Sequence, residues 1–139
     1  MAANTSPIFT RTPDVQWIGA VATANTTTDL TTGTVYLAFT ADATEGGFIQ
    51  KLIFRPLGTN TASVARVWLN NGSDPTGAAA NNTCIAEATL AATTVSQVAQ
   101  LTSVEVLIDF AIPAGYRLYV TLGTTVASGY NVSTIAGRY

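Results

Sequence analysis

The sequence predicts a single all-β domain, an antiparallel β-sandwich with a jelly-roll-like arrangement of about eight strands. Threonine, a β-branched residue that suits pleated strands, accounts for 24 of the 139 residues. Short runs alternate between apolar and polar residues, and turn residues separate them at nearly regular spacing. No stretch of about 11 residues or more shows the 3.6-residue period of an amphipathic helix. An immunoglobulin-like sandwich is the alternative topology.

The first half of the chain contains an extended arm and four expected strands. Pro7 and Pro13 fix φ and favour extended neighbours, so we expect an arm over residues 1–14 and the sandwich over residues 15–139. Strands are expected at 16–24, 34–41, 48–57 and 62–70, separated by the polar or glycine-rich segments 25–33, 42–47 and 58–61. Three groups of apolar side chains are each expected to share one face of their strand: Val35, Leu37 and Phe39; Phe48, Leu52 and Phe54; and Ala65, Val67 and Leu69.

The second half begins with the longest irregular segment, residues 71–82, which is rich in glycine, asparagine and other turn formers. Further strands are expected at 83–90, 104–112, 116–123 and 130–136, while 97–103 forms a short strand or leads into the next. The alternation is cleanest in 104–112, which we expect to place Val104, Val106, Ile108, Phe110 and Ile112 on one face. Pro113-Ala114-Gly115 then forms a tight turn.

Charge is scarce, which excludes several classes of partner. The chain has 6 Lys and Arg, 8 Asp and Glu, and a formal net charge of −2. It therefore lacks a basic patch that would attract nucleic acids or anionic membranes, and we expect neither as a partner. No apolar run approaches the ~18 residues of a membrane span. Met1 is followed by neither a basic nor an apolar leader segment, so we expect synthesis in a cytosol without a signal peptide.

The residues that usually carry chemistry are also scarce. The chain has no histidine, and Cys84, its one cysteine, is expected to be a small buried hydrophobe. Glu105 and Asp109 share a strand face but lie roughly 13 Å apart, too far for a glycosidase pair. We expect them on a solvated face or paired with Arg55, Arg66 or Arg117. The loop around Asp74 lacks the calcium-loop pattern. We therefore expect no enzyme activity, no cofactor and no metal.

Five aromatic residues are open to more than one interpretation: Trp17, Tyr36, Trp68, Tyr119 and Tyr130. Their rings can fill a core, anchor an interface or form a platform for sugars. Trp68 shares a strand face with Arg66, a pair of residue types that is common in binding hot spots. Packing in the core or at a sheet edge is the interpretation that we favour for Trp68.

Three stretches carry a resemblance to a known family: residues 49–72, with R-V-W-L-N-N-G; residues 107–123, with I-P-A-G-Y-R-L; and residues 130–139. Together they resemble capsid decoration, or cement, proteins of tailed bacteriophages. The resemblance implies a β-sandwich protein that is made in the host bacterial cytoplasm and binds the outer surface of the phage head. It would assemble as a homotrimer and stabilise contacts between subunits of the major capsid protein.

On that basis we expect the capsid and trimer contacts to come from the arm and the exposed sheet faces. The candidate interface residues are Ile8, Phe9, Arg11, Arg66, Trp68, Tyr119 and Tyr139. We expect the 71–82 loop to point outward. Three alternatives remain: a tail, baseplate or head-fibre module that binds a host glycan; a shell-forming jelly-roll coat protein, whose usual basic arm is reduced here to Arg11; and an unrelated β-module.

Overall fold

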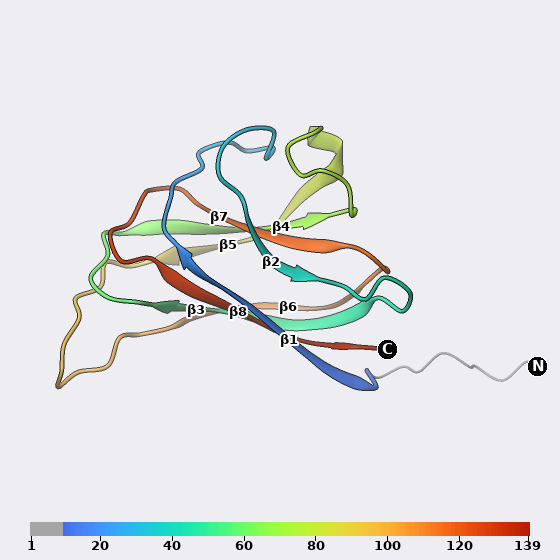
Figure 1. Ribbon diagram of the computed structural model, residues 1–139. Helices are drawn as coiled ribbons and strands as arrows, with labels where there is room; N and C mark the ends of the chain where they lie inside the picture. Colours follow the sequence, from blue (N-terminus) through green and yellow to red (C-terminus); the bar gives the residue numbers. More distant parts are fainter. Residues whose placement is uncertain (1–9) are drawn as a thin grey trace, which may run out of the picture.

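The computed structural model describes residues 10–139 as two four-stranded antiparallel sheets that pack face to face (Figure 1). The strands are β1 (Thr12–Val21), β2 (Tyr36–Thr40), β3 (Gly47–Pro56), β4 (Ser63–Asn70), β5 (Asn82–Leu90), β6 (Val104–Ile112), β7 (Arg117–Leu122) and β8 (Tyr130–Arg138). A single turn of 3₁₀-helix, η1 (Ala79–Asn81), precedes β5.

The strand order is β1-β8-β3-β6 in one sheet and β2-β7-β4-β5 in the other. Eight antiparallel strands shared in this way between two sheets form a jelly roll. The predicted fold class is therefore confirmed. A continuous apolar core lies between the sheets, and Phe39, Phe54, Leu118 and Tyr130 are among its fully buried side chains.

One predicted boundary needs correction, and one open alternative is resolved. β1 begins at Thr12, which pairs with Arg138 of β8, so the sheet includes three residues that we assigned to the arm. Residues 97–103 form no strand and belong to the long connection between β5 and β6. Within this connection, Thr93 forms an isolated antiparallel β-bridge with Asn60.

The predicted one-face sets are wrong wherever a β-bulge adds a residue to a strand. A bulge between Leu37 and Phe39 turns Leu37 outward, 42% exposed, while Phe39 is 1% exposed. In β3 the register shifts between Ile49 and Lys51, so Ile49 rather than Phe48 joins the core. In β6, Asp109 takes a left-handed φ of 59° at the shift, which breaks the expected continuous face. Each added residue reverses the direction of the side chains that follow it.

Part of the outer face of the β2-β7-β4-β5 sheet, around Trp68 and Tyr119, is covered by the chain itself. The loop between β1 and β2, residues 22–35, rises over this sheet in Figure 1. Its Leu30 is fully buried against Trp68 and Tyr119, and Val35 packs beside them. Leu30 has a left-handed φ of 62°, an unfavourable conformation for leucine that the packing of its side chain compensates. The Trp68 indole Nε1–H donates to Thr121 Oγ1 at 3.0 Å.

The side chain of Asn25 holds this loop in shape. Asn25 Nδ2 donates to the carbonyl oxygens of Thr32 and Thr34, both at 3.0 Å, and Asn25 Oδ1 accepts the N–H of Thr27 at 3.0 Å. These bonds supply a buried asparagine with partners at both ends of the loop. The loop is therefore a fixed cover, and it makes a second, smaller apolar cluster outside the sandwich.

Removing the leucine side chain tests this cover. Leu30→Ala leaves a cavity over Trp68, so we expect the free energy of unfolding to fall by about 2–5 kcal/mol in urea melts. The matched substitution Leu37→Ala removes an exposed leucine near the same sheet and should change stability by about 0.5 kcal/mol or less. Equal effects of the two substitutions would contradict the assignment of Leu30 as the buried cover.

The turn between β2 and β3 is organised by one carboxylate. Asp42 Oδ1 accepts the N–H groups of Thr44 and Glu45, both at 2.9 Å, and the Thr44 hydroxyl at 2.8 Å. Arg138 Nη1 lies 3.5 Å from Asp42 Oδ2. The hydrogen bonds from Thr44 and Glu45, with a smaller contribution from the Arg138 charge, lower the pKa of Asp42 from 3.8 to about 2.

This lowered pKa predicts how the turn responds to acid. Because the folded-state pKa lies below the unfolded-state value, the stabilisation is complete above pH 4 and is lost as the pH falls through about 2. We expect the Asp42 carboxyl carbon and the Glu45 amide to titrate together near pH 2 by NMR. In Asp42→Asn, which keeps an acceptor oxygen, the Glu45 amide should lose this titration. A midpoint at the ordinary aspartate value would contradict the turn geometry.

Candidate interaction surface

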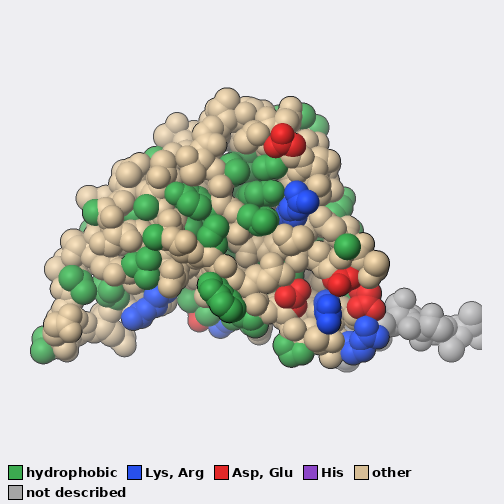
Figure 2. All heavy atoms as spheres, in the orientation of Figure 1, with side chains coloured by type: hydrophobic (Ala, Val, Ile, Leu, Met, Phe, Trp, Pro, Cys, Tyr) green, Lys and Arg blue, Asp and Glu red, His purple; other side chains and the backbone are tan. Residues whose placement is uncertain are grey.

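The outer face of the β1-β8-β3-β6 sheet carries exposed apolar side chains. Trp17 on β1 is 73% exposed, Leu107 on β6 is 72% exposed and Val15 on β1 is 47% exposed. Figure 2 shows hydrophobic side chains that stand out along the course of β1. Exposed leucine, valine and tryptophan gathered on one sheet face are typical of an interaction surface, whereas single exposed apolar residues are ordinary.

The strand register defines this surface. Val15, Ile135, Lys51 and Leu107 form one row across the four strands, and Trp17, Ser133, Ile53 and Glu105 form the next. The row between them faces inward, since Thr134, Leu52 and Val106 are buried. With strands ~4.8 Å apart, each outer row spans roughly 14 Å. We call these eight residues the outer-sheet patch.

The charges of the outer-sheet patch are paired with each other. Lys51 Nζ lies 3.1 Å from both carboxylate oxygens of Glu105, across β3 and β6. Next to the patch, Arg55 Nη1 donates to the carbonyl oxygen of Leu101 at 3.1 Å. Glu105 therefore lies on a salt-bridged face as predicted, with Lys51 as its partner in place of an arginine. A partner of the patch meets mainly apolar surface and one neutral ion pair.

The patch depends on an unusual arrangement at β1, where a polar residue points inward. Gln16 is half-buried, and its side chain bonds the backbone of β2: Nε2 donates to the Thr40 carbonyl at 2.9 Å, and Oε1 accepts the Thr40 N–H at 2.9 Å. Gln16 thereby links the edges of the two sheets. Its neighbours Val15 and Trp17 must then point outward, because side chains alternate along a strand.

The candidate interface residues do not gather on one surface. Ile8 and Phe9 lie outside the described residues. Arg11 is exposed and pairs with Glu45 at 2.8 Å, and it also donates to the Tyr139 carbonyl oxygen at 3.4 Å. Tyr139 is half-buried. Arg11 and Tyr139 are therefore neighbours, but they hold the two ends of the described chain together.

The predicted anchor roles of Trp68 and Tyr119 need correction. Their exposed fractions are 2% and 6%, because the 22–35 loop covers both rings. Core packing, the interpretation favoured for Trp68, is the one observed. Arg66, which is half-buried, has its Nε 2.6 Å from Glu87 Oε1. The sequence grouped Trp17 with the other aromatic residues, and no local signal separates it, because the inward direction of Gln16 depends on its bonds to Thr40 of β2.

Cys84 is exposed, which corrects the expectation of a buried residue. Partial burial of its sulfur raises the pKa of the thiol, so it is protonated at neutral pH. Among residues 10–139, no group of three His, Cys, Asp or Glu side chains is placed to hold a metal ion. The same residues form no helix long and apolar enough to cross a membrane.

The 71–82 loop is exposed and is shaped by its own polar side chains. Asp74 Oδ1 accepts the N–H of Thr76 at 3.0 Å, and Asn81 Nδ2 donates to the Asp74 carbonyl at 2.9 Å. Asn82 Nδ2 donates to the Pro75 carbonyl at 2.7 Å. These are the short-range bonds by which asparagine and aspartate form turns.

No family profile and no curated protein matches this chain. A chain in the structure of infectious bursal disease virus Gt strain is similar to 99% of it, with 16% sequence identity and a TM-score of 0.31. This protein spans 36% of the length of that chain. A likeness this distant assigns neither family nor function.

The two tryptophans test the assignment of the exposed face. Trp17→Ala should change the free energy of unfolding by about 0.5 kcal/mol or less, because little of the ring is packed. Trp68→Ala should cost about 3–5 kcal/mol in the same urea melts, because it opens a cavity under the loop. A large loss of stability in Trp17→Ala would show that Trp17 is held within the protein.

Proposed function

We propose that this chain is a structural virion protein that decorates the outer surface of a phage head and stabilises contacts between major capsid subunits. The single observation that carries the proposal is the outer-sheet patch, an apolar face with an exposed tryptophan and an internally paired charge. The proposal gives the chain no catalytic role, and it places the protein on the outside of the virion after synthesis in the bacterial cytoplasm.

The chemistry of the patch supports a protein partner. Tryptophan is enriched among the residues that dominate binding energy, since its large ring loses much water-exposed area on burial. The Lys51–Glu105 pair can remain intact at such an interface, so docking need not bury a charge without a partner. An apolar contact also keeps its strength in salt, whereas exposed ion pairs are screened.

The resemblance to decoration proteins supplies the choice of partner. Its stretch 49–72 contributes most of β3 and all of β4, and its stretch 107–123 contributes much of β6 and all of β7. The third stretch, 130–139, contributes all of β8. Of the outer-sheet patch, Lys51, Ile53, Leu107, Ser133 and Ile135 lie within the three stretches, while Val15, Trp17 and Glu105 lie outside them. A homotrimer would present three such patches, and tethering gains affinity because the second and third contacts are intramolecular.

A host glycan is the second candidate ligand, and Trp17 is the observation that favours it. Sugar faces stack on exposed aromatic rings, and such sites usually offer several polar groups alongside. Within residues 10–139, Trp17 is the only tryptophan or tyrosine that is classed as exposed. One exposed tryptophan without a second exposed tryptophan or tyrosine beside it favours a protein surface over a sugar platform.

Co-sedimentation with undecorated heads tests the proposal. The double substitution Trp17→Asp, Leu107→Asp puts two charges into the patch, and we expect binding to weaken by roughly tenfold or more. Leu37→Asp is the matched control, because it charges an exposed leucine on the opposite sheet, and its binding should equal that of the wild type.

Two outcomes would contradict the proposal. If the double variant bound heads as well as the wild-type protein does, the outer-sheet patch would not be part of the contact with the head. Wild-type protein that fails to bind heads, but binds a host-surface glycan in a manner abolished by Trp17→Asp, would favour the glycan-binding alternative.

A further inference from the structure

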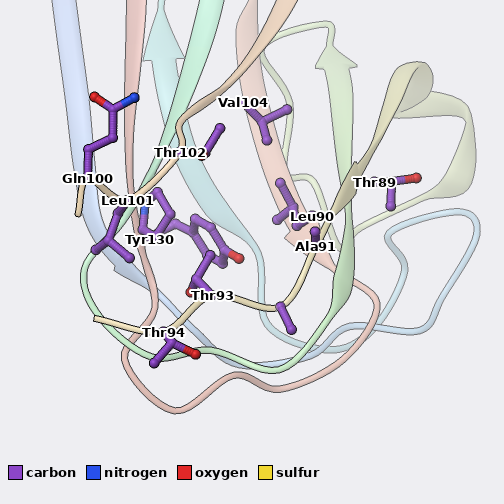
Figure 3. Close-up of a pocket in the computed structure, with 12 residues that line it drawn as sticks. Thr89, Leu90, Ala91, Thr93, Thr94, Gln100, Leu101, Thr102, Val104 and Tyr130 are labelled. Atoms are coloured by element: carbon purple, nitrogen blue, oxygen red, sulfur yellow. The ribbon is translucent and has the colours of Figure 1, made fainter. Parts of the chain in front are cut away.

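A pocket of about 370 Å³ opens at the end of the sandwich where the long β5–β6 connection, residues 91–103, crosses from one sheet to the other (Figure 3). Its size lies at the lower end of the range for ligand sites. Pro56, Leu90, Leu101 and Val104 supply apolar walls, and Tyr130 contributes its ring from β8. None of the residues that line it is charged, so it suits a neutral occupant.

The pocket contains a buried donor without a partner. Tyr130 is 1% exposed, and its hydroxyl has no hydrogen-bond partner among the described residues. Burial raises the pKa of Tyr130, and the neighbouring Asn60 side chain lowers it in part. Asn60 Nδ2 donates to the Gly129 carbonyl at 3.0 Å, and Asn60 Oδ1 accepts the N–H groups of Ser128 and Gly129 at 2.8 and 2.9 Å, so Asn60 has no free acceptor for the hydroxyl proton. The hydroxyl is itself buried in the wall of the pocket, so an occupant meets the apolar side chains around it.

The lining selects among neutral occupants. A sugar needs an open aromatic face, but the Tyr130 ring is buried and offers none. Aliphatic walls without a charge fit an aliphatic side chain. A loop of a protein with a small apolar residue at its tip has this chemistry.

The 91–103 connection of this chain provides such a tip. Val98 is 98% exposed and Val95 is 51% exposed, and Figure 1 shows the loop as a projection from the body of the sandwich. Hydrophobic side chains lie at the end of this projection in Figure 2. No charged residue occurs between Glu87 and Glu105 in the sequence, so the tip is as neutral as the pocket.

Side chains hold the loop in a defined shape. Ser96 Oγ accepts the N–H groups of Val98 and Ala99 at 3.1 and 3.2 Å. At its base, the Val95 N–H donates to Thr59 Oγ1 at 3.1 Å. A long connection that is fixed in this way can insert into a partner at a low cost in conformational entropy.

We propose that the Val98 tip of one copy of this chain inserts into the Tyr130 pocket of a second copy, where the Val98 side chain packs on the apolar walls. Tip and pocket are different patches, so the contact is heterologous and closes into a ring when the rotation between copies permits. This inference rests on the proposed function in one respect, the homotrimer, and it identifies the contact that joins the subunits of that trimer.

Complementation between two variants tests this contact. Val98→Asp removes the tip and leaves the pocket, while Ala91→Trp fills the mouth of the pocket and leaves the tip. Wild-type protein should sediment as a trimer, and each variant alone should sediment as a monomer, with self-association weakened roughly tenfold or more. An equal mixture should form a complex of two chains and nothing larger, since only one tip–pocket contact remains. Thr94→Trp replaces Ala91→Trp if thermal melts show that the latter is misfolded.

Leu107→Asp separates this contact from capsid binding. This variant should stay trimeric while its binding to heads weakens, so the two proposals can fail independently. A wild-type protein that stays monomeric at every concentration would overturn the tip–pocket contact, as would a trimeric Val98→Asp or a mixture without hetero-complex. Binding of a neutral monosaccharide to monomeric protein, followed by NMR shifts at Tyr130, would assign the pocket to a sugar and overturn it too.

Discussion

The central constraint on this molecule is that a sandwich of two sheets leaves two outer faces, and the chain covers the large apolar side chains of only one of them with a loop of its own. On the β2-β7-β4-β5 sheet, Leu30 seals Trp68 and Tyr119 from water, even though its own backbone must adopt a left-handed φ of 62° to do so. On the other sheet, Trp17 and Leu107 are each more than 70% exposed. Covering one tryptophan with a dedicated loop while exposing another on an apolar face is an asymmetry that a partner for the exposed face would explain.

Electrostatics reinforces this asymmetry, because the charges are used locally. Arg11 pairs with Glu45, Lys51 with Glu105, Arg66 with Glu87 and Arg138 with Asp42. These pairs connect neighbouring strands or the chain ends and leave the broad faces close to neutral. Contacts with other proteins must then rely on shape and on burial of apolar area, which favours a permanent, static partner over transient electrostatic encounters.

Much of the fold could be predicted from the sequence. Period-two alternation located all eight strands, and the prediction for β6 matched both of its ends. Side-chain direction was less predictable, because each bulge shifts the alternation by one residue. The bulge in β2 separates Leu37 from Phe39, and no proline or glycine in β2 marks it. Bulges of this kind follow from how strands pair across the sandwich, which is not encoded in the local pattern.

The candidate surface was less predictable than the fold. Trp17 and Trp68 are both tryptophans in amphipathic strands, and their difference depends on the 22–35 loop, which packs on Trp68 although the two are far apart in the sequence. Only the packing of Leu30 buries one, and only the inward bond of Gln16 to Thr40 turns the other outward. The pocket at Tyr130 was also unforeseen, since it is formed by a connection whose sequence was ambiguous between strand and loop.

Hydroxyl-radical footprinting of the protein, free and bound to heads, tests the central claim most directly, because it reports the solvent exposure of each side chain in the working assembly. The account predicts that oxidation of Trp17 and Leu107 falls strongly on the head while Trp68 stays protected in both states. Unchanged oxidation of Trp17 and Leu107 on fully occupied heads would contradict it, since the bare sheet face would then have no partner there.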